Sequence, residues 1–122
     1  MNKLIFILMM LFIGCAGFQG LTWTTQDLYL SAKIRAGMTT EEVLAIMGDP
    51  IFSELDRNVE EWHYCATGSG EGDSFVALFF VDNQIIAKKQ YNASEGLGSC
   101  EKFVKMGTYE VPFEVQEILD NN

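Results

Sequence analysis

Three cysteines carry the most reactive side chains of this 122-residue chain, and their surroundings differ. Cys15 follows a run of apolar residues at positions 4 to 13, whereas Cys65 and Cys100 lie in the body of the chain. In an exported protein, two such body cysteines most simply form a disulfide. We therefore predict a bond between Cys65 and Cys100, and we treat Cys15 as the candidate for lipid attachment.

The predicted disulfide would close a loop of about 36 residues, for which the chain-entropy estimate of stabilisation is about 3 to 4 kcal/mol. That amount is a large share of the stability expected for one domain. The bond would therefore be a main support of the fold.

His63 is the only histidine of the chain. It shares one face of a predicted strand with Cys65, and Cys100 would complete three metal ligands only if both cysteines were reduced. Structural zinc sites use four protein ligands and catalytic sites usually three. We expect no metal and no cofactor, and we interpret His63 as a partly exposed strand residue.

No arrangement typical of a nucleophilic or phosphate-binding site is evident. Ser69 lies between two glycines but lacks the strand–turn–helix frame of a nucleophile elbow. The surrounding loop, 67–73, leads into a strand and carries Glu71 and Asp73, which would repel phosphate. We interpret the loop as a flexible connection and the adjacent glutamates at 60 and 61 as a solvated face. The sequence therefore predicts no enzymatic activity.

The first segment has the pattern of an export signal, in which Lys3 precedes the apolar run and small residues follow it. The run is about half as long as the roughly 20 residues needed to span a bilayer. Phe12-Ile13-Gly14-Cys15 resembles a bacterial lipobox, with Phe12 where leucine is usual. Gly14-Cys15-Ala16 also resembles an ordinary secretory cleavage site, so both routes stay open, with lipidation favoured. In the lipoprotein sorting rule, Ala16 after the cysteine implies the outer membrane.

Composition and charge limit the partners of the chain. It has 17 acidic and 8 basic residues, a net charge of -9, and 48% hydrophobic residues. Nucleic acid binding needs clustered lysine and arginine, so this class is excluded, as is electrostatic docking on anionic lipid. The predicted organisation is a signal peptide at 1–14, an acylated N-terminus and linker at 15–24, and one domain at 25–122, with a C-terminal extension at 92–122.

Two helices are predicted at the start of the domain. The first covers 26–36, because Leu30 and Ile34 share one face, and Gly37 would be its left-handed C-terminal cap. The second follows at once.

Thr39 and Glu42 form the capping-box pattern that opens the second helix. Gly48 follows its last periodic residue, and Pro50 prevents continuation. This helix has about two turns, so tertiary contacts must hold it in place.

The rest of the chain reads as strands that form an antiparallel meander. Trp62 and Tyr64 alternate with His63 and Cys65, and Asp82-Asn83 is a plausible two-residue hairpin turn. Residues 111–119 are predicted as a short helix with Pro112 at its first position. The predicted strands are 59–66, 74–81 and 84–91, with 100–106 as a candidate fourth.

The chain contains, in this order, the motifs 32–39 (AKIRAGMT), Val43, 47–50 (MGDP), Trp62-His63-Tyr64 and 78–80 (LFF). Together they resemble the SmpA/OmlA (BamE-like) family of small outer-membrane lipoproteins. The resemblance covers roughly residues 26 to 91. It implies an α+β fold in which two N-terminal helices pack on a three- to four-stranded antiparallel sheet, related to the β-lactamase-inhibitor-like group.

Within that resemblance, the recurring residues are interpreted as determinants of the fold rather than as a binding site. The extension at 92–122 has no counterpart in the small family members. The residues given this structural role are Gly37, Thr39, Glu42, Gly48, Pro50, Trp62 and Tyr64.

The resemblance implies a non-catalytic lipoprotein, anchored at the periplasmic face of the outer membrane, that binds envelope proteins and assists β-barrel assembly. Weak candidates for partner contact are Arg35, Arg57, Glu71 and Asp73. The alternative is a soluble periplasmic inhibitor or ligand-binding module, whose acidic surface would meet a basic cleft on an enzyme.

Overall fold

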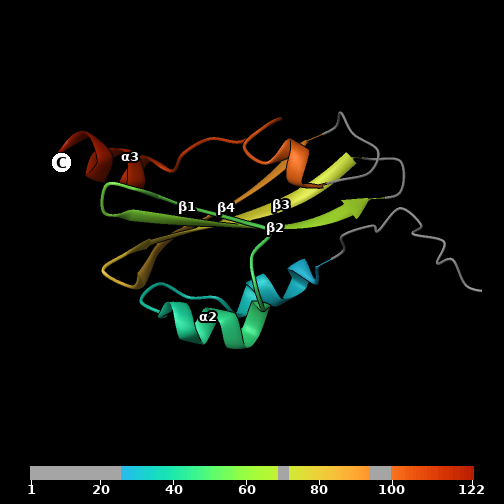
Figure 1. Cartoon of the computed structure of the whole chain (residues 1–122), viewed down its shortest axis with the longest axis horizontal. Helices are drawn as coiled ribbons and strands as arrows, with labels where there is room; N and C mark the ends of the chain where they lie inside the picture. The colour runs from blue at the N-terminus through green and yellow to red at the C-terminus, as the bar shows by residue number, and fades with distance from the viewer. Residues whose placement is uncertain (1–25, 69–71, 94–99) are drawn as a thin grey trace, which may run out of the picture.

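The computed structural model describes residues 26–68, 72–93 and 100–122. They form an α+β fold in which a four-stranded antiparallel sheet lies between an N-terminal and a C-terminal layer (Figure 1). The elements, in chain order, are the 3-10 helix η1 (Leu28–Lys33), the helix α2 (Thr40–Met47), the strands β1 (Phe52–Asp56), β2 (Val59–Gly68), β3 (Gly72–Val81) and β4 (Gln84–Ala93), the 3-10 helix η2 (Cys100–Phe103) and the helix α3 (Phe113–Asp120).

The sheet is a meander in which each strand pairs with the next along the chain. Asp82 and Asn83 join β3 to β4, with φ angles of 49° and 62°. A two-residue turn with positive φ at both positions matches the right-handed twist of the flanking strands. The predicted hairpin turn is therefore present.

The central strand β3 is buried on both faces, as its continuous apolar sequence predicts. Val76, Leu78 and Phe80 belong to the core beneath the N-terminal layer. On the opposite face, Phe75 and Phe79 belong to the core beneath the C-terminal layer. The sheet thus separates two apolar cores.

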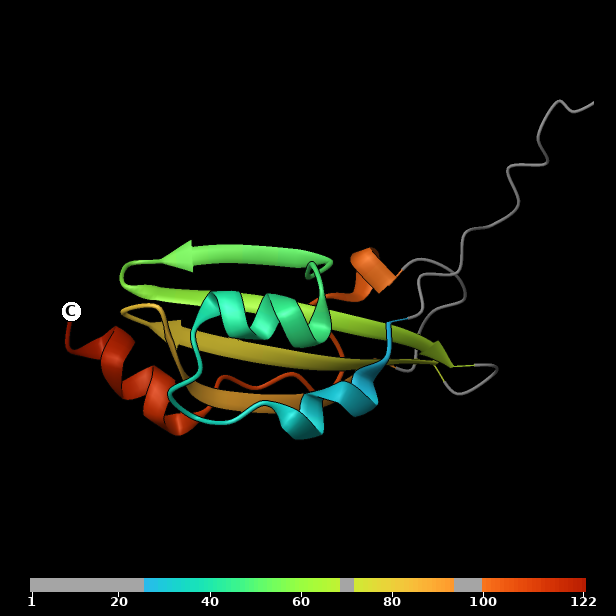
Figure 2. The same cartoon turned by 90° about the horizontal axis from the view of Figure 1, so that it is seen from below.

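The helices η1 and α2 lie side by side on one face of the sheet (Figure 2). The N–H of Glu42 donates to Thr39 Oγ1 at 3.3 Å, and the Glu42 carboxylate accepts from the N–H of Thr39 at 3.0 Å. This capping box satisfies two backbone donors that would otherwise lack partners. Gly48 ends α2 with a φ of 75°, shortly before Pro50.

The first helix differs from the prediction of an α-helix over 26–36. Only Leu28–Lys33 is helical, and it is a 3-10 helix. The chain leaves the helix because the next residues pair with the sheet edge: the N–H of Gly37 donates to the Ile85 C=O, and the N–H of Ile85 donates to the Met38 C=O, both at 2.8 Å. Gly37, with a φ of 85°, therefore serves this edge contact and is not a helix cap.

The prediction of a fourth strand at 100–106 is wrong. This segment begins with η2, and the additional strand is β1, which pairs with β2 at the other side of the sheet. The C-terminal extension, including α3, lies on the face opposite α2 (Figure 1). The extension therefore covers the second face of the sheet instead of widening it.

The expected signal peptide at 1–14, the linker at 15–24 with Cys15, and Glu71 lie outside the described residues. In the ranges that the structure does describe, none of the helices has both the length and the apolar character that a bilayer crossing requires.

Candidate functional site

A disulfide joins Cys65 of β2 to Cys100 of η2, the pairing expected from the sequence. The two Cα atoms are 6.1 Å apart, and both side chains are completely buried. The bond connects the sheet to the start of the last described segment. It therefore fastens the C-terminal layer to the second face of the sheet.

Asp73 lies close to this disulfide and is not the exposed contact residue that the sequence suggested. It belongs to β3, is 1% exposed, and has a carboxylate oxygen within 4.8 Å of both cysteine sulphur atoms. Among the described residues, neither carboxylate oxygen has a hydrogen-bond partner. Because the Asp73 side chain is buried between the sheet and the disulfide, it does not form part of an exposed contact surface.

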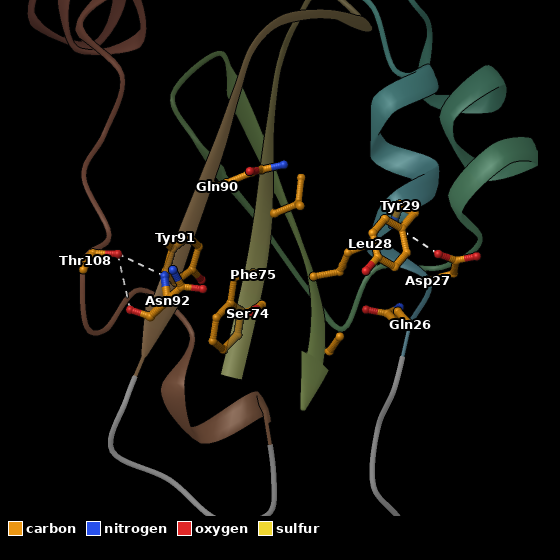
Figure 3. A pocket seen from close by; sticks show the side chains of 12 residues that line it. Gln26, Asp27, Leu28, Tyr29, Ser74, Phe75, Gln90, Tyr91, Asn92 and Thr108 are labelled. Atoms are coloured by element: carbon orange, nitrogen blue, oxygen red, sulfur yellow. Dashed lines mark hydrogen bonds between the residues drawn. The ribbon is translucent and has the colours of Figure 1, made fainter. Parts of the chain in front are cut away.

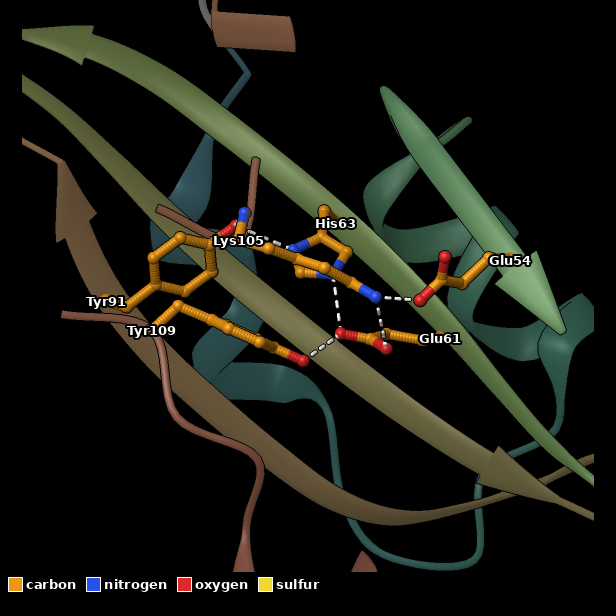
Figure 4. Close-up of polar contacts among 6 residues, drawn as sticks. All are labelled: Glu54, Glu61, His63, Tyr91, Lys105 and Tyr109. Atoms are coloured by element: carbon orange, nitrogen blue, oxygen red, sulfur yellow. Dashed lines mark hydrogen bonds and ion pairs between the residues drawn. The ribbon is translucent and has the colours of Figure 1, made fainter. Parts of the chain in front are cut away.

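A second polar cluster lies on the same face, where the C-terminal layer covers β2 and β4 (Figure 4). His63 Nε2 is 2.8 Å from Glu61 Oε1, and His63 Nδ1 is 2.7 Å from the Tyr91 hydroxyl. The Tyr91 oxygen accepts the backbone N–H of Lys105 at 3.1 Å. A neutral imidazole that donates from Nε2 to Glu61 and accepts the Tyr91 O–H at Nδ1 satisfies all of these contacts.

Two predictions about these residues are therefore wrong. His63 is 0% exposed rather than partly exposed, and Glu61 is 8% exposed rather than solvated. Both are buried because the segment containing Lys105 and Tyr109 folds over their face of β2. Figure 4 shows these side chains converging on Glu61.

Glu61 receives further contacts from the C-terminal layer. The Tyr109 hydroxyl donates to Glu61 Oε1, and the Lys105 ammonium lies 3.4 Å from Glu61 Oε2. Lys105 also pairs with Glu54 of β1. A buried carboxylate is costly unless it is paired and hydrogen-bonded, so these contacts allow Glu61 to occupy this position.

Burial shifts the titration of the groups around Glu61. It raises the pKa of Tyr91 to about 12, with the Glu61 charge acting in the same direction. Burial, followed by the hydrogen bond to Glu61, also raises the pKa of Tyr109, while burial lowers the pKa of the Lys105 ammonium. The hydroxyl groups therefore stay protonated and keep donating across the neutral pH range.

We refer to Glu61, His63, Tyr91, Lys105 and Tyr109 as the polar latch. Its members bond to one another and join two strands to the C-terminal layer. The pair of Glu61 and His63 could have been found in the sequence, because residues two apart on a strand share a face. The contribution of Tyr109 had no such signal.

A groove of about 840 Å³ opens between the start of η1, the first residues of β3 and the last residues of β4 (Figure 3). Its apolar lining residues are Leu28, Ala66, Phe75 and Val76, and polar residues surround them. Tyr29, at the rim, is 93% exposed. The groove is larger than the hollow of about 590 Å³ that is lined by Arg35, Met38 and Ile46 in the N-terminal layer. Its polar lining comprises Gln26, Asp27, Tyr29, Ser74, Gln90, Tyr91, Asn92 and Thr108.

The exposed arginines proposed for partner contact do not form one surface. Arg57 lies in the turn between β1 and β2, where its guanidinium donates to the C=O of Leu119 in the C-terminal layer. Arg35 lies in the N-terminal layer, and its backbone N–H donates to Met38 Sδ at 3.4 Å. The sheet separates the two residues.

The aromatic pair Trp62 and Tyr64 on β2 connects the sheet to the end of α2. The Tyr64 hydroxyl donates to the Gly48 C=O at 2.8 Å, and burial raises its pKa, with Asp49 as the second cause. The Trp62 ring lies 4.7 Å from that of Phe80. These contacts fit a structural role for Trp62 and Tyr64.

Two comparisons with known proteins bear on this geometry. A family profile described as the outer membrane protein assembly factor BamE domain matches residues 26–90, which is more than half of the chain. The match covers η1, α2, the first three strands and most of β4. No curated protein matches the chain.

Proposed function

The chain belongs to the BamE domain family of outer membrane protein assembly factors, and from this premise we propose that it is a non-catalytic lipoprotein that binds other assembly proteins at the periplasmic face of the outer membrane. The single observation that carries the proposal is the family match over residues 26–90. That range contains both helical elements of the N-terminal layer and nearly all of the sheet.

The proposed attachment to the membrane rests on the N-terminal sequence. Cleavage before Cys15 would remove residues 1–14, leave an acylated cysteine, and give a linker at 15–24 that leads into Gln26. Each buried methylene of an acyl chain contributes about 0.8 kcal/mol to membrane binding. An anchor of this kind raises the local concentration of the domain around membrane partners. Ala16 favours the outer membrane.

The polar latch supports a binding role over catalysis. His63 is the side chain most suited to proton transfer near neutral pH, and it is fully buried. Both of its ring nitrogens already have partners, Glu61 and Tyr91. The side chains of the polar latch are therefore engaged in holding the C-terminal layer in place.

Cell fractionation with mass spectrometry of the mature N-terminus tests the anchor. We expect the protein in the outer-membrane fraction, beginning at Cys15 and carrying the mass of acyl chains. A Cys15→Ser variant should move to the soluble fraction or remain unprocessed. An unmodified, water-soluble mature chain in the wild type would contradict the proposal.

The groove beside η1 favours a second candidate function. Its volume of about 840 Å³ is within the range of ligand-binding pockets, which suits a soluble periplasmic inhibitor or ligand-binding module. The same experiment separates the two candidates, because this second function needs ordinary secretory cleavage and release from the membrane.

A further inference from the structure

The outer edge of β4 is covered by other parts of the chain at two places. Near its start, both backbone groups of Ile85 bond to Gly37 and Met38. Near its end, the Asn92 C=O accepts the N–H of Thr108 at 2.9 Å, and the N–H of Asn92 donates to Thr108 Oγ1 at 3.0 Å. Such covers protect an edge strand from pairing with other chains.

Strand geometry identifies the groups that lie between these two covers. In an antiparallel pair, alternate residues direct their N–H and C=O groups toward the partner strand, and the others direct them away. Because Asn92 directs its groups away from β3, Gln90 and Lys88 do so too. In the described ranges, these backbone groups have no hydrogen-bond partner, and both side chains are exposed. We call the N–H and C=O groups of Lys88 and Gln90 the open edge of β4.

We propose that the open edge of β4 binds a short extended segment of another envelope protein, which joins the sheet as an additional strand. Backbone hydrogen bonds give this mode its affinity, and neighbouring pockets for alternate side chains give it specificity. A bulge in β4 opposite Phe79 and Phe80 pairs Ile85 and Asn92 with β3 residues that are six positions apart, which is roughly 20 Å at about 3.3 Å per residue. The space between the covers therefore accepts a segment of about five residues and excludes a long strand.

The charge of β4 indicates the chemistry of this segment. β4 contains Lys88 and Lys89 and no acidic residue, although the whole chain has a net charge of -9. The Lys88 ammonium donates to the C=O of Ser31 at 2.7 Å, which holds it against η1 on the N-terminal side of the sheet. Opposite charges on neighbouring strands stabilise a sheet, whereas like charges destabilise it. An acidic segment therefore fits, and a second copy of β4 would place lysines against lysines.

The groove gives the added strand a place for its side chains. Gln90, Asn92 and Thr108 form the part of the groove nearest to the edge of β4, and Leu28 and Tyr29 face them (Figure 3). Side chains of the segment that point toward the N-terminal layer would enter this groove. The edge and the groove together make one binding surface.

This inference rests on the proposed function, because it names the surface and the partner chemistry of the same protein-binding role. Its test uses the purified mature protein in detergent and a five-residue synthetic peptide of alternating valine and glutamate. We expect the peptide to slow hydrogen exchange at the amides of Lys88 and Gln90 by at least tenfold, measured by nuclear magnetic resonance. Gln90→Pro should weaken peptide binding about fivefold, because proline lacks the outward-facing donor.

Leu55→Pro is the matched control on the opposite edge of the sheet. The pairing of Asp56 with Val59 closes the β1–β2 turn, so the backbone groups of Asp56 point toward β2. Leu55 is the adjacent residue, and its N–H therefore points away from the sheet. This variant should bind the peptide as the wild type does. Circular dichroism establishes that both proline variants are folded.

A charge exchange provides a second variant that leaves the backbone unchanged. The double variant Lys88→Glu with Lys89→Glu should no longer bind the glutamate peptide. It should instead bind a peptide in which lysine replaces glutamate. Equal binding of both peptides by the wild type would overturn the inference, as would unchanged binding by Gln90→Pro. Protection of the Lys88 and Gln90 amides by self-association, without peptide, would also overturn it.

The test of this surface and the test of the proposed function can fail separately. Outer-membrane fractionation and recovery of assembly proteins do not depend on the synthetic peptide. If the protein fractionates with the outer membrane but does not bind the peptide, only the open edge of β4 is refuted as the binding surface.

Discussion

His63 Nε2 lies 2.8 Å from Oε1 of Glu61, two positions earlier on β2. This pair is the centre of the polar latch, and Tyr109 of the C-terminal extension donates to the same oxygen of Glu61. Within the described residues, the extension adds no strand to the sheet after the last two residues of β4. Its position on the second face therefore depends on this cluster, on the disulfide and on apolar contacts such as Val115.

Replacing His63 tests the latch. His63→Ala should lower the free energy of unfolding by about 2 to 4 kcal/mol, because it leaves a cavity and removes a hydrogen bond from the buried Glu61. Tyr109→Phe keeps the ring and removes only one donor, so it should cost about 1 to 3 kcal/mol. Urea unfolding measures both. An unchanged midpoint for His63→Ala would contradict the structural role of the pair.

The disulfide should contribute strongly to stability. Reduction of the folded protein should lower the free energy of unfolding by about 3 to 4 kcal/mol, because the unfolded chain regains the freedom of the loop between Cys65 and Cys100. Guanidinium unfolding with and without dithiothreitol measures the change. The double variant Cys65→Ala with Cys100→Ala is the control, since reductant should not affect it. Two reactive thiols in the non-reduced, denatured mature protein would refute the bond.

The raised pKa of Tyr91 predicts loss of stability at alkaline pH. Its value is about 12 in the folded protein, compared with 10.0 for an unperturbed tyrosine. Between these values the native state keeps a proton that the unfolded state has lost, so stability falls as pH rises. The contribution is complete below pH 10 and disappears as pH passes 12. Thermal unfolding from pH 9 to 12 should show a shallower decline for Tyr91→Phe than for the wild type; identical slopes would exclude this cause.

The capping box predicts a local contribution from Thr39. Thr39→Ala should destabilise the domain by about 1 kcal/mol, because the N–H of Glu42 loses its acceptor. Thr39→Ser keeps the hydroxyl and should stay within about 0.5 kcal/mol of the wild type. The two variants can be compared by urea unfolding. Equal stability of Ala and Ser at this position would show that the cap contributes nothing.

Local patterns in the sequence predicted much of the fold. The capping box of Thr39 and Glu42, the turn at Asp82-Asn83 and the doubly buried strand β3 each follow from neighbouring residues. The order of the motifs also indicated the family. These features are local or periodic, and tertiary packing did not override them.

The features that the sequence did not predict depend on distant contacts. The short strand β1 has only five residues and is defined by its pairing with β2. The first helix is shortened because Gly37 and Met38 bond to Ile85, which is far away in sequence. His63 and Asp73 looked exposed because nothing in their own strands indicates the C-terminal layer that covers them. The open edge of β4 likewise required the positions of both covering segments.

Quantitative mass spectrometry of proteins that co-purify from detergent-extracted envelopes tests the assembly role most directly. The account predicts enrichment of β-barrel assembly proteins with the wild-type chain, and much lower recovery with Cys15→Ser, which lacks the acyl anchor. Recovery of no assembly protein with the wild type, or equal recovery with both chains, would contradict it.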